Sequence, residues 1–503
     1  MANGYKSFLD SPYAGEMPDA HGAGEAGDTG CGALIRIFIR FSGAEVSRAS
    51  FEATGSSAAI AAASRLCERV TGSSWRAAAS LAPAALVAGL EESGLNNSRT
   101  ITAAAGFAVE ALSRALEDSL RRGSFPDAGK TQTAVPPPRD ALPVLVAMSG
   151  GVDSAVACLL EQRAGREVAG VTMRLWSDPE CEAGENACCS PQAILDARAV
   201  CHRLGVPHLT VDFREDFKSI VVDDFVAGYR AGRTPNPCTH CNASFRFPLL
   251  LELARRLGAA RVATGHYARM AGGGSVSGGA RLARGLDREK DQSYMLWGIS
   301  QELLGKIEFP LAEMSKEETR RLARGAGLPV HDRPESQEVC FIPDNDYRRF
   351  LRSRLRGRPG ALPGAGDIVD ISGNRLGPHR GYIDYTVGQR RGLGLSAPEP
   401  LYVLATDPEN NRVVVGRHEE LAVRRLRIVA VNAFMEPEQI TAPMAQVRYN
   451  SEPVPCRLIA AGAREDGWEI ELGRPVFGVA PGQSAVIYQG DQVAAGGVIA
   501  GTG

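Results

Sequence analysis

The 503-residue sequence lacks several features that would assign it to a protein class at once. It has no apolar run near the roughly 20 residues of a membrane-spanning helix. Residues 1–22 also lack the apolar core of a secretory signal peptide. Its 11 cysteines are too few for a disulfide scaffold in a chain of this length. We therefore expect a cytoplasmic protein in which clustered cysteines are catalytic or bind a metal.

A strong charge of one sign is also missing. The chain has 56 Lys and Arg against 58 Asp and Glu, which gives a formal net charge of −2. A nucleic-acid partner would therefore have to be held by local basic patches. Hydrophobic residues make up 44% of the sequence, an ordinary value for a globular chain long enough for about three domains.

The N-terminal quarter predicts a separate small domain. Residues 33–54 contain two stretches of the kind that pair in a hairpin, and alanine-rich helical stretches follow. This pattern indicates an α+β domain over residues 1–122. Residues 123–142 are rich in proline and polar side chains and have no period, which indicates a linker.

The rest of the chain predicts a multidomain α/β protein. Over residues 143–348 short apolar strands alternate with helices, and residues 261–270 are expected to continue this alternation as one strand. Such alternation is typical of a parallel sheet with helices on both faces. Residues 349–418 are irregular and rich in Gly and Arg, and predict a small central domain. Residues 419–503 contain short strands separated by Gly and Pro turns, which predict a β-barrel.

A glycine-rich turn follows the first strand of the predicted parallel sheet. In "VLVAMSGGVDSAVACLL", Ser149, Gly150 and Gly151 lie between an apolar strand and a helix start. Adjacent glycines let an anion approach the backbone, and the free N–H groups and dipole of the helix attract it. Asp153 and Ser154 fall in the first helical turn, where they cap the helix or reach a metal-bound phosphate. No GK[ST] follows, so the loop is not of the Walker type.

This SGGxDS loop resembles the pyrophosphatase loop of the ATP-pyrophosphatase superfamily. The resemblance implies ATP, with Mg²⁺, as the nucleotide that is cleaved between its α and β phosphates. Several kinds of synthetase share the loop, so it leaves the substrate open.

Two cysteines three positions apart, Cys238 and Cys241, occur in "TPNPCTHCNASFRF". A structural zinc site would need two more ligands. The candidates for these are Cys188, Cys189 and His240. A thioredoxin-like pair would need a helix start to lower the thiol pKa, whereas Pro235 and Pro237 favour an extended or turn conformation.

Sulfur transfer is the third interpretation of these cysteines. Cys340, in "ESQEVCFIPD", follows Cys241 by 99 residues, and the two are expected to meet at the mouth of the sheet. One thiol would then carry a terminal sulfur as a persulfide, and the other would attack or resolve it by disulfide exchange. The isolated cysteines are expected to be buried without a chemical role, namely Cys67, Cys158, Cys201 and Cys456.

The chain from about residue 142 to residue 503 resembles the bacterial tRNA-specific 2-thiouridylase family. The motifs that carry the resemblance occur in the family's order: "AMSGGVDSAVACLL", "GVTMRLW", "TPNPCTHCN", "VATGHYAR", "KDQSYML", "SQEVCFI", "HRGYIDYTVGQRRGLG" and "DPENNRVVVG". The resemblance implies thiolation of the wobble uridine in the tRNAs for lysine, glutamate and glutamine. ATP adenylates the oxygen on uracil carbon 2, and a persulfide sulfur then replaces AMP.

The resemblance also implies roles for individual residues. Cys241 would be the nucleophile and Cys340 the persulfide carrier. ATP would contact Ala147, Met148, Ser149, Gly150, Gly151, Val152, Asp153, Ser154, Met173 and Gly265. The target base and tRNA would contact Asn236, Pro237, Cys238, His266, Lys290, Asp291, Gln292, Arg448, Tyr449 and Gln483. The central domain would bind tRNA, with Arg380, Arg390 and Arg391 as its basic patch. The sulfur donor would be a cysteine desulfurase or a sulfur-relay protein, and no membrane partner is expected.

One departure from the family pattern concerns the cofactor. Some family members have an aspartate where this chain has Cys238. Cys238, Cys241 and Cys340 could therefore hold three corners of a [4Fe–4S] cluster and leave one iron open for sulfide. Persulfide chemistry and cluster-dependent chemistry both stay open at this point.

Residues 8–122 resemble the U-type iron–sulfur scaffold family. Of the family's ligands only Cys31 is present, and the other positions hold Ala33, Ser56 and Ala104. We therefore expect a degenerate scaffold that keeps the fold, and as a hypothesis keeps a docking surface for a desulfurase. Two other functions stay open, an iron–sulfur carrier or assembly protein and another ligase that uses the same ATP loop.

Overall fold

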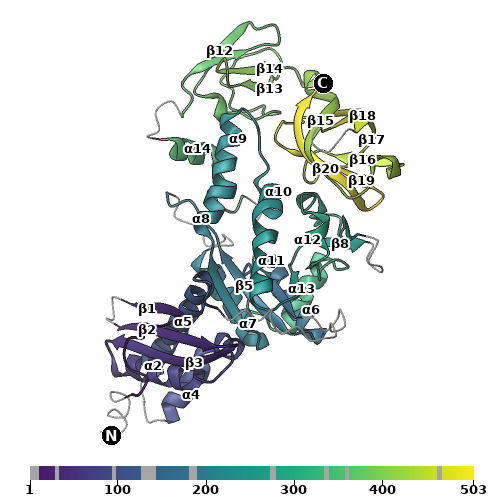
Figure 1. The fold of residues 1–503 in the computed structure, drawn as a ribbon. Coiled ribbons are helices and arrows are strands. Elements are labelled where there is room, and N and C mark those ends of the chain that lie inside the picture. Colours follow the sequence, from purple (N-terminus) through teal and green to yellow (C-terminus); the bar gives the residue numbers. More distant parts are fainter. Residues whose placement is uncertain are drawn as a thin grey trace.

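The computed structural model shows four parts that follow one another along the chain (Figure 1). It describes residues 11–28, 33–92, 98–125, 143–180, 190–271, 279–333, 339–356, 362–461 and 467–503. The predicted linker over residues 123–142 lies almost wholly outside these ranges. Among the helices described, none is long and apolar enough to cross a membrane.

The N-terminal domain is an antiparallel sheet backed by helices. Its strands are β1 (Gly22–Asp28), β2 (Ala33–Ser42) and β3 (Glu45–Thr54), in the order β1-β2-β3. Its helices are α2 (Ser57–Val70), α3 (Trp75–Ala79), α4 (Pro83–Glu92) and α5 (Ser98–Arg121). The predicted hairpin is confirmed as β2 and β3. Strand β1 was not predicted, because "GAGEAGD" has none of the β-branched or aromatic residues that mark a strand.

The glycines of β1 have a packing role. A Cβ atom on Gly22 would lie 2.1 Å from the carbonyl oxygen of Ala115, and one on Gly24 would lie 2.3 Å from that of Ala111. Both carbonyls belong to α5, so only glycine allows β1 to lie this close to the helix backbone.

A five-stranded parallel sheet forms the centre of the second part. Its strand order is β10-β7-β4-β5-β6, and every neighbouring pair runs parallel. The strands are β4 (Val144–Ala147), β5 (Val168–Arg174), β6 (His208–Asp212), β7 (Arg261–Ala263) and β10 (Ile307–Glu308). The helices around it include α6 (Val152–Arg163), α7 (Pro191–Leu204), α11 (Phe247–Arg256) and α13 (Lys316–Gly325). The predicted α/β fold class is confirmed.

Alternate residues of the strands face two different cores. Val144 and Val146 pack with α6, α7 and α13, whereas Leu145 belongs to a cluster that also contains Leu250 of α11 and Leu112 of α5. Helix α5 of the N-terminal domain therefore shares one apolar core with the parallel sheet. Polar contacts reinforce the seam, since Glu110 pairs with Arg198 and the carbonyl of Leu120 accepts from Arg256 at 3.2 Å.

The expectation of one strand over residues 261–270 was wrong. Only β7, at Arg261–Ala263, joins the parallel sheet. The chain then leaves it, and β8 (Ala268–Ala271) pairs antiparallel with β9 (Arg281–Arg284) in another sheet. The break occurs because Gly265 and Tyr267 turn toward the start of α6, where each contacts Asp153.

A helical column connects the sheet to the other domains. It contains α8 (Arg214–Phe217), η3 (Lys218–Val222), α9 (Asp223–Arg230), α10 (Pro237–Cys241) and η4 (Asn242–Arg246), and α11 follows. Shorter elements are η5 (Ser293–Met295), α12 (Gln301–Leu304), η6 (Tyr382–Asp384), η7 (His418–Leu421) and η8 (Pro437–Gln439).

The last two parts are built from strands. The central domain contains α14 (Tyr347–Leu355) and a sheet of order β12-β11-β14-β13, formed by β11 (Gly366–Val369), β12 (Arg375–His379), β13 (Tyr402–Asp407) and β14 (Arg412–Gly416). The C-terminal strands are β15 (Ala422–Ala433), β16 (Pro443–Gln446), β17 (Val454–Ala461), β18 (Trp468–Phe477), β19 (Ser484–Gln489) and β20 (Gln492–Thr502). The pairing of β15 with β20 closes these strands into the predicted barrel, and β9 joins its wall through β20.

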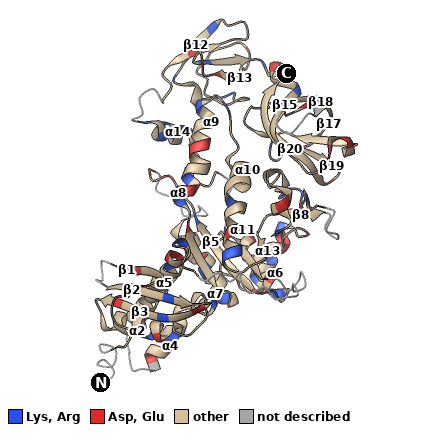
Figure 2. Cartoon of the chain, in the orientation of Figure 1, with Lys and Arg blue, Asp and Glu red and all other residues tan. Residues whose placement is uncertain are grey.

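Charged side chains of both signs are distributed over all four parts (Figure 2). This distribution agrees with the near-zero net charge of the sequence. A polyanion must therefore be held by local clusters of basic residues.

Substitution of Gly24 tests the packing of β1 on α5. Gly24→Ala is expected to destabilise the protein by about 2 kcal/mol or more, because its methyl group meets helix backbone that cannot move aside. The matched control is Gly106→Ala in α5, where no atom lies within 4 Å of the added Cβ. That change should instead stabilise the helix by about 0.5–1 kcal/mol. Thermal unfolding of both variants checks the prediction, and equal melting temperatures would contradict it.

Candidate active site

The glycine-rich loop lies at the carboxyl edge of the parallel sheet. Ser154 Oγ accepts from the backbone N–H of Ser149 at 3.2 Å and donates to the carbonyl of Gly151 at 3.0 Å. Gly150 has φ +75°, and a Cβ there would lie 2.2 Å from the carbonyl oxygen of Ala193. The turn therefore requires glycine, and the first N–H groups of α6 have no side-chain cap.

The other residues expected to contact ATP surround this turn. Ala147 ends β4, and the buried Met148 follows it. Val152 begins α6, after Gly151 in the N-cap position. Met173 lies near the end of β5, at the same edge of the sheet. A Cβ on Gly265 would lie 2.6 Å from the backbone of Asp153, so this glycine packs directly on the first turn of α6.

Two further residues, which the sequence did not single out, contact Asp153. The hydroxyl of Tyr267 donates to its carboxylate at 2.9 Å, and Lys316 Nζ lies 2.8 Å from both carboxylate oxygens. Burial and the neighbouring Asp153 raise the pKa of Tyr267, so its hydroxyl stays protonated. No local pattern marks Lys316, because it follows Asp153 by 163 residues in an ordinary capping box.

Arg333 holds the loop from another side. Its guanidinium donates to the carbonyl of Gly150 at 2.9 Å and to Asp196 of α7 at 2.6 Å. The side chain is only 15% exposed. Arg333 therefore fixes the turn against α7, a role that no sequence motif indicated.

The residues around Cys238 and Cys241 form a short helix, α10, which corrects one expectation. We expected Pro235 and Pro237 to favour an extended or turn conformation, but Pro237 occupies the first helical position, where proline needs no N–H. Asn236 is the N-cap, and its side-chain oxygen accepts from the N–H of Cys238 at 3.1 Å. Cys238 is exposed and Cys241 is buried.

The segments that contain Cys241 and Cys340 pack against the same apolar cluster. Cys241 is a member of this cluster, and the half-buried Cys340 and Met173 pack against it. Aromatic rings link the two segments. The ring of Phe341 lies 5.8 Å from that of Phe217, which lies 5.2 Å from that of Phe245 in η4. The structure therefore brings both thiols to one region together with Met173 of β5.

No zinc site or cluster site is found among the residues described, since no three His, Cys, Asp or Glu side chains gather there as metal ligands. His240 Nε2 lies 3.0 Å from the carbonyl oxygen of Ile220. Cys188 and Cys189 lie outside the described residues. Of the isolated cysteines, Cys67, Cys158 and Cys201 are buried as expected, but Cys456 is only half-buried.

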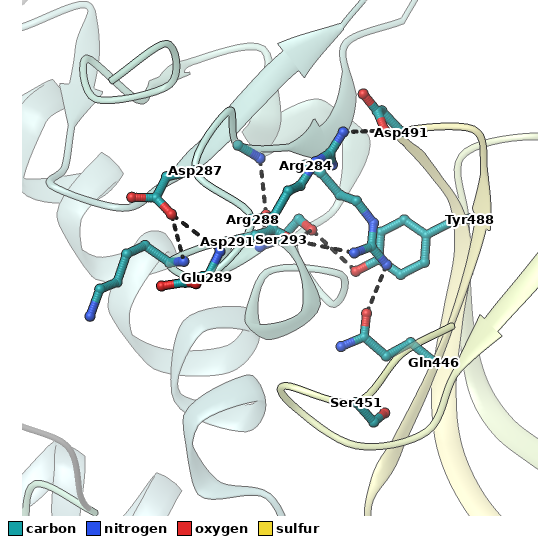
Figure 3. A network of polar contacts seen from close by, with 12 residues as sticks. Arg284, Asp287, Arg288, Glu289, Asp291, Ser293, Gln446, Ser451, Tyr488 and Asp491 are labelled. Carbon is teal, nitrogen blue, oxygen red and sulfur yellow. Dashed lines mark hydrogen bonds and ion pairs between the residues drawn. The ribbon is translucent and has the colours of Figure 1, made fainter. Parts of the chain in front are cut away.

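The residues expected to contact tRNA differ in their surroundings. Asp291 is buried, where its carboxylate accepts from the N–H groups of Gly285 at 3.0 Å and Ser293 at 3.1 Å (Figure 3). Gln292 pairs with the backbone of Tyr267. In this structure both residues support the fold of their segment, and the two neighbours of Asp291, Lys290 and Gln292, are half-buried.

The other candidates lie in two different parts of the chain. Desolvation lowers the pKa of His266 to about 3, so its ring is neutral, and it lies 5.9 Å from the ring of Phe247. On the barrel, Arg448 is exposed, and the ring of Tyr449 lies 6.1 Å from that of Tyr294.

Residues 230–234, just before α10, are held by two domains. From the central domain, the hydroxyls of Tyr382 and Thr406 donate to the carbonyls of Arg230 and Gly232, at 2.6 and 2.8 Å. From the barrel, Gln483 Nε2 donates to the carbonyl of Thr234 at 2.9 Å. The N–H of Thr234 donates to the carbonyl of Pro481 at 2.8 Å. We call residues 230–234 the joint segment.

A cavity of about 930 Å³ opens on the central domain. Four arginines are among its lining residues, namely Arg348, Arg380, Arg390 and Arg391. All four are exposed, and Arg348 also donates to the carbonyl of Asp384 at 2.7 Å. Three of these arginines are the basic patch predicted from the sequence, and Arg348 was missed because it belongs to α14.

In the N-terminal domain, the residues expected at the cluster-ligand positions of the scaffold family support the fold. Ser56 is the N-cap of α2, and its Oγ accepts from the N–H of Ala59 at 3.3 Å. Ala33 and Ala104 are buried in the apolar core. Cys31 lies outside the described residues.

Family models match each of the four parts. They are described as a NifU-like N terminal domain over residues 6–123, a tRNA methyl transferase HUP domain over 142–344, a tRNA methyl transferase PRC-barrel domain over 350–417 and an aminomethyltransferase beta-barrel domain over 420–499. The bifunctional protein NifU/MnmA of Rubrobacter xylanophilus is 45% identical over 494 residues, which cover 97% of this chain and 96% of that protein. The tRNA-specific 2-thiouridylase MnmA of Chloroflexus aurantiacus is 46% identical over 362 residues, which cover 71% of this chain and 98% of that protein.

The HUP sheet, the barrel and the attached NifU-like domain thus define a tRNA-modifying sulfurtransferase with an additional N-terminal domain. The chain belongs to the family of bifunctional NifU/MnmA proteins. Its thiouridylase part is a tRNA-uridine 2-sulfurtransferase.

Asp291 tests whether a residue expected to contact tRNA instead supports the fold. Asp291→Ala is expected to destabilise the protein by about 2–3 kcal/mol, because buried N–H groups lose their acceptor. Glu289→Ala is the control, since this neighbouring carboxylate is exposed. Urea unfolding measures both. If Asp291→Ala keeps full stability and loses only tRNA binding, the carboxylate faces tRNA, as the family resemblance implied.

Proposed function

We propose that this enzyme adenylates the wobble uridine of the tRNAs for lysine, glutamate and glutamine, and then transfers sulfur through Cys241 and Cys340. The observation that supports this most directly is the packing of both cysteines against one apolar cluster, although 99 residues separate them in the sequence. Met173, at the carboxyl edge of the sheet, packs against the same cluster. We therefore expect the thiols to lie near the edge where the glycine-rich loop would hold the ATP phosphates.

In the first step, the loop residues 149–154 hold the phosphates through backbone N–H groups. The uracil O2 attacks the α-phosphorus, the bond to the bridging oxygen breaks, and pyrophosphate leaves with that electron pair. Adenylation is needed because an amide-like oxygen is a poor leaving group. Asp153 is the carboxylate of the loop that would hold Mg²⁺, whose charge would offset that of the phosphates.

In the second step, Cys340 carries the sulfur as a persulfide. The Cys241 thiolate attacks the inner sulfur, which forms a disulfide with Cys340 and releases hydrosulfide. Hydrosulfide adds to carbon 2 of the adenylated uridine, and AMP leaves. A thiol reductant then restores both cysteines. Because the described residues gather no three metal ligands, we derive no step through a [4Fe–4S] cluster.

The tRNA is expected to lie across α10, the barrel and the central domain. Asn236, Pro237 and the exposed Cys238 would face the extruded target base, at an unstacking cost of a few kcal/mol. The exposed Arg448 of the barrel and the arginine-lined cavity of the central domain would contact phosphates.

A cysteine desulfurase or a sulfur-relay protein would load Cys340. The NifU-like domain would serve as a docking surface for it rather than as a cluster carrier, because Ala33, Ser56 and Ala104 replace ligand positions. The hypothesis of an iron–sulfur carrier is disfavoured for the same reason.

Serine substitutions separate the chemical steps. Cys241→Ser and Cys340→Ser should each abolish 2-thiouridine formation but leave ATP-dependent adenylation, because neither thiol contributes to the first step. The control is Cys456→Ser, whose thiol lies on the barrel strand β17 and has its pKa raised to about 12 by burial. Mass spectrometry of wobble nucleosides, after incubation with tRNA, ATP and a sulfur source, measures the product. Full activity of either variant would refute the assigned roles, and activity that requires bound iron and sulfide would refute the persulfide route.

The proposed role of the arginine-lined cavity in tRNA binding can be tested separately. The double change Arg390→Gln and Arg391→Gln should weaken tRNA binding and reduce the slope of log K against log salt concentration by roughly 1.5–2 units. The matched double control is Arg375→Gln with Arg417→Gln, since both are exposed central-domain arginines paired with carboxylates. Filter binding at several salt concentrations tests this, and an unchanged slope would remove the cavity from the tRNA site.

A further inference from the structure

The charged pair of Lys316 and Asp153 lies where the proposed nucleotide phosphates meet α6. We infer that Lys316 is a binding residue for the β- and γ-phosphates, and so for the pyrophosphate leaving group. The inference rests on the proposed function, in which the loop of residues 149–154 binds ATP.

The position of Lys316 is fixed by its local structure. Ser315 and Glu318 form a capping box that begins α13 at Lys316. The backbone N–H of Lys316 donates to Asp287 at 3.0 Å. From this anchored position the side chain reaches Asp153 in the first turn of α6, with Nζ 2.8 Å from both oxygens.

The stability of α13 does not explain a cation at this position. Lys316 is the first residue of the helix, where the dipole disfavours positive charge. Its side chain is only 12% exposed, so its desolvation also has a cost. The carboxylates of Asp287 and Glu318 cap the start of α13, whereas the start of α6 has no side-chain cap. The uncapped positive end of α6 therefore lies beside the ammonium group, with Asp153 as the acidic residue of its first turn. Such a site favours a ligand with several negative charges.

The nucleotide supplies those charges at a defined place. ATP carries a β- and a γ-phosphate that AMP lacks. The backbone amides of the loop, which would contact phosphate oxygens, carry no formal charge. During adenylation the electron pair of the broken bond moves to the bridging oxygen of pyrophosphate. The ammonium group of Lys316 would stabilise that developing charge. The contribution of Lys316 should therefore appear for ATP and pyrophosphate, and not for AMP.

Binding measurements on the full-length protein test this difference. Lys316→Met is expected to weaken ATP and pyrophosphate binding by about 10- to 100-fold, the usual effect of a lost hydrogen bond to a charged group. AMP binding should change by less than about 3-fold, because AMP lacks the phosphates concerned. Lys316→Arg keeps the positive charge and should recover part of the affinity. Isothermal titration calorimetry with ATP, pyrophosphate and AMP gives all three values.

A matched control and a folding check accompany these variants. Lys306→Met removes a lysine that is 55% exposed and pairs with Glu302, and it should leave all three affinities unchanged. Melting temperatures verify that the Lys316 variants fold, and Lys316→Arg provides the comparison if Lys316→Met does not.

The possible outcomes separate this inference from the proposed function. If Lys316→Met binds ATP with the same affinity as the wild type, the inference is wrong. An equal loss of ATP and AMP binding would also overturn it, because Lys316 would then act only by holding Asp153. Gly150→Ala disrupts the loop itself, since its Cβ would meet the carbonyl of Ala193. If that variant binds ATP as the wild type does, the proposed nucleotide site is wrong, whatever the Lys316 variants show.

Discussion

The joint segment, residues 230–234, is the constraint on which the geometry of the site depends. It begins at the last residue of α9 and continues without regular structure, and two different domains donate hydrogen bonds to its carbonyls, the central domain at Arg230 and Gly232 and the barrel at Thr234. Helix α10 begins only three residues later, so the position of Cys241 depends on contacts from three parts of the chain. These hydrogen bonds are partly buried and link the position of α10 to the arrangement of the domains.

The sequence predicted most of the fold because its strands and helices follow clear periods. The alternation of strands and helices after residue 143 correctly indicated a parallel sheet, and the spaced strands at the C-terminus indicated a barrel. Strand β1 was missed because its glycines respond to the approach of α5, which no local pattern contains. The single strand expected over residues 261–270 is divided because Tyr267 bonds to Asp153, a contact between residues 114 positions apart.

The sequence predicted those site residues that lie within one motif, but not those that reach the site from distant parts of the chain. The residues of the glycine-rich loop lie together because they are consecutive. Lys316 and Arg333 reach the loop only through the packing of α13 and the segment after it. The proline before Cys238 was misjudged for a different reason. Proline is compatible with both a turn and a first helical position, and here the Asn236 cap decides for the helix.

The packing of the NifU-like domain on the parallel sheet affects how the whole enzyme unfolds. Leu112 of α5 and Leu145 of β4 belong to one continuous core, so the N-terminal domain and the parallel-sheet domain do not melt as independent units. A harmful change in the N-terminal domain, far from any reacting atom, then reduces the amount of folded thiouridylase. The mutational tolerance of the two parts of the chain is thus linked, because the need for folded thiouridylase also preserves the packing of the NifU-like domain.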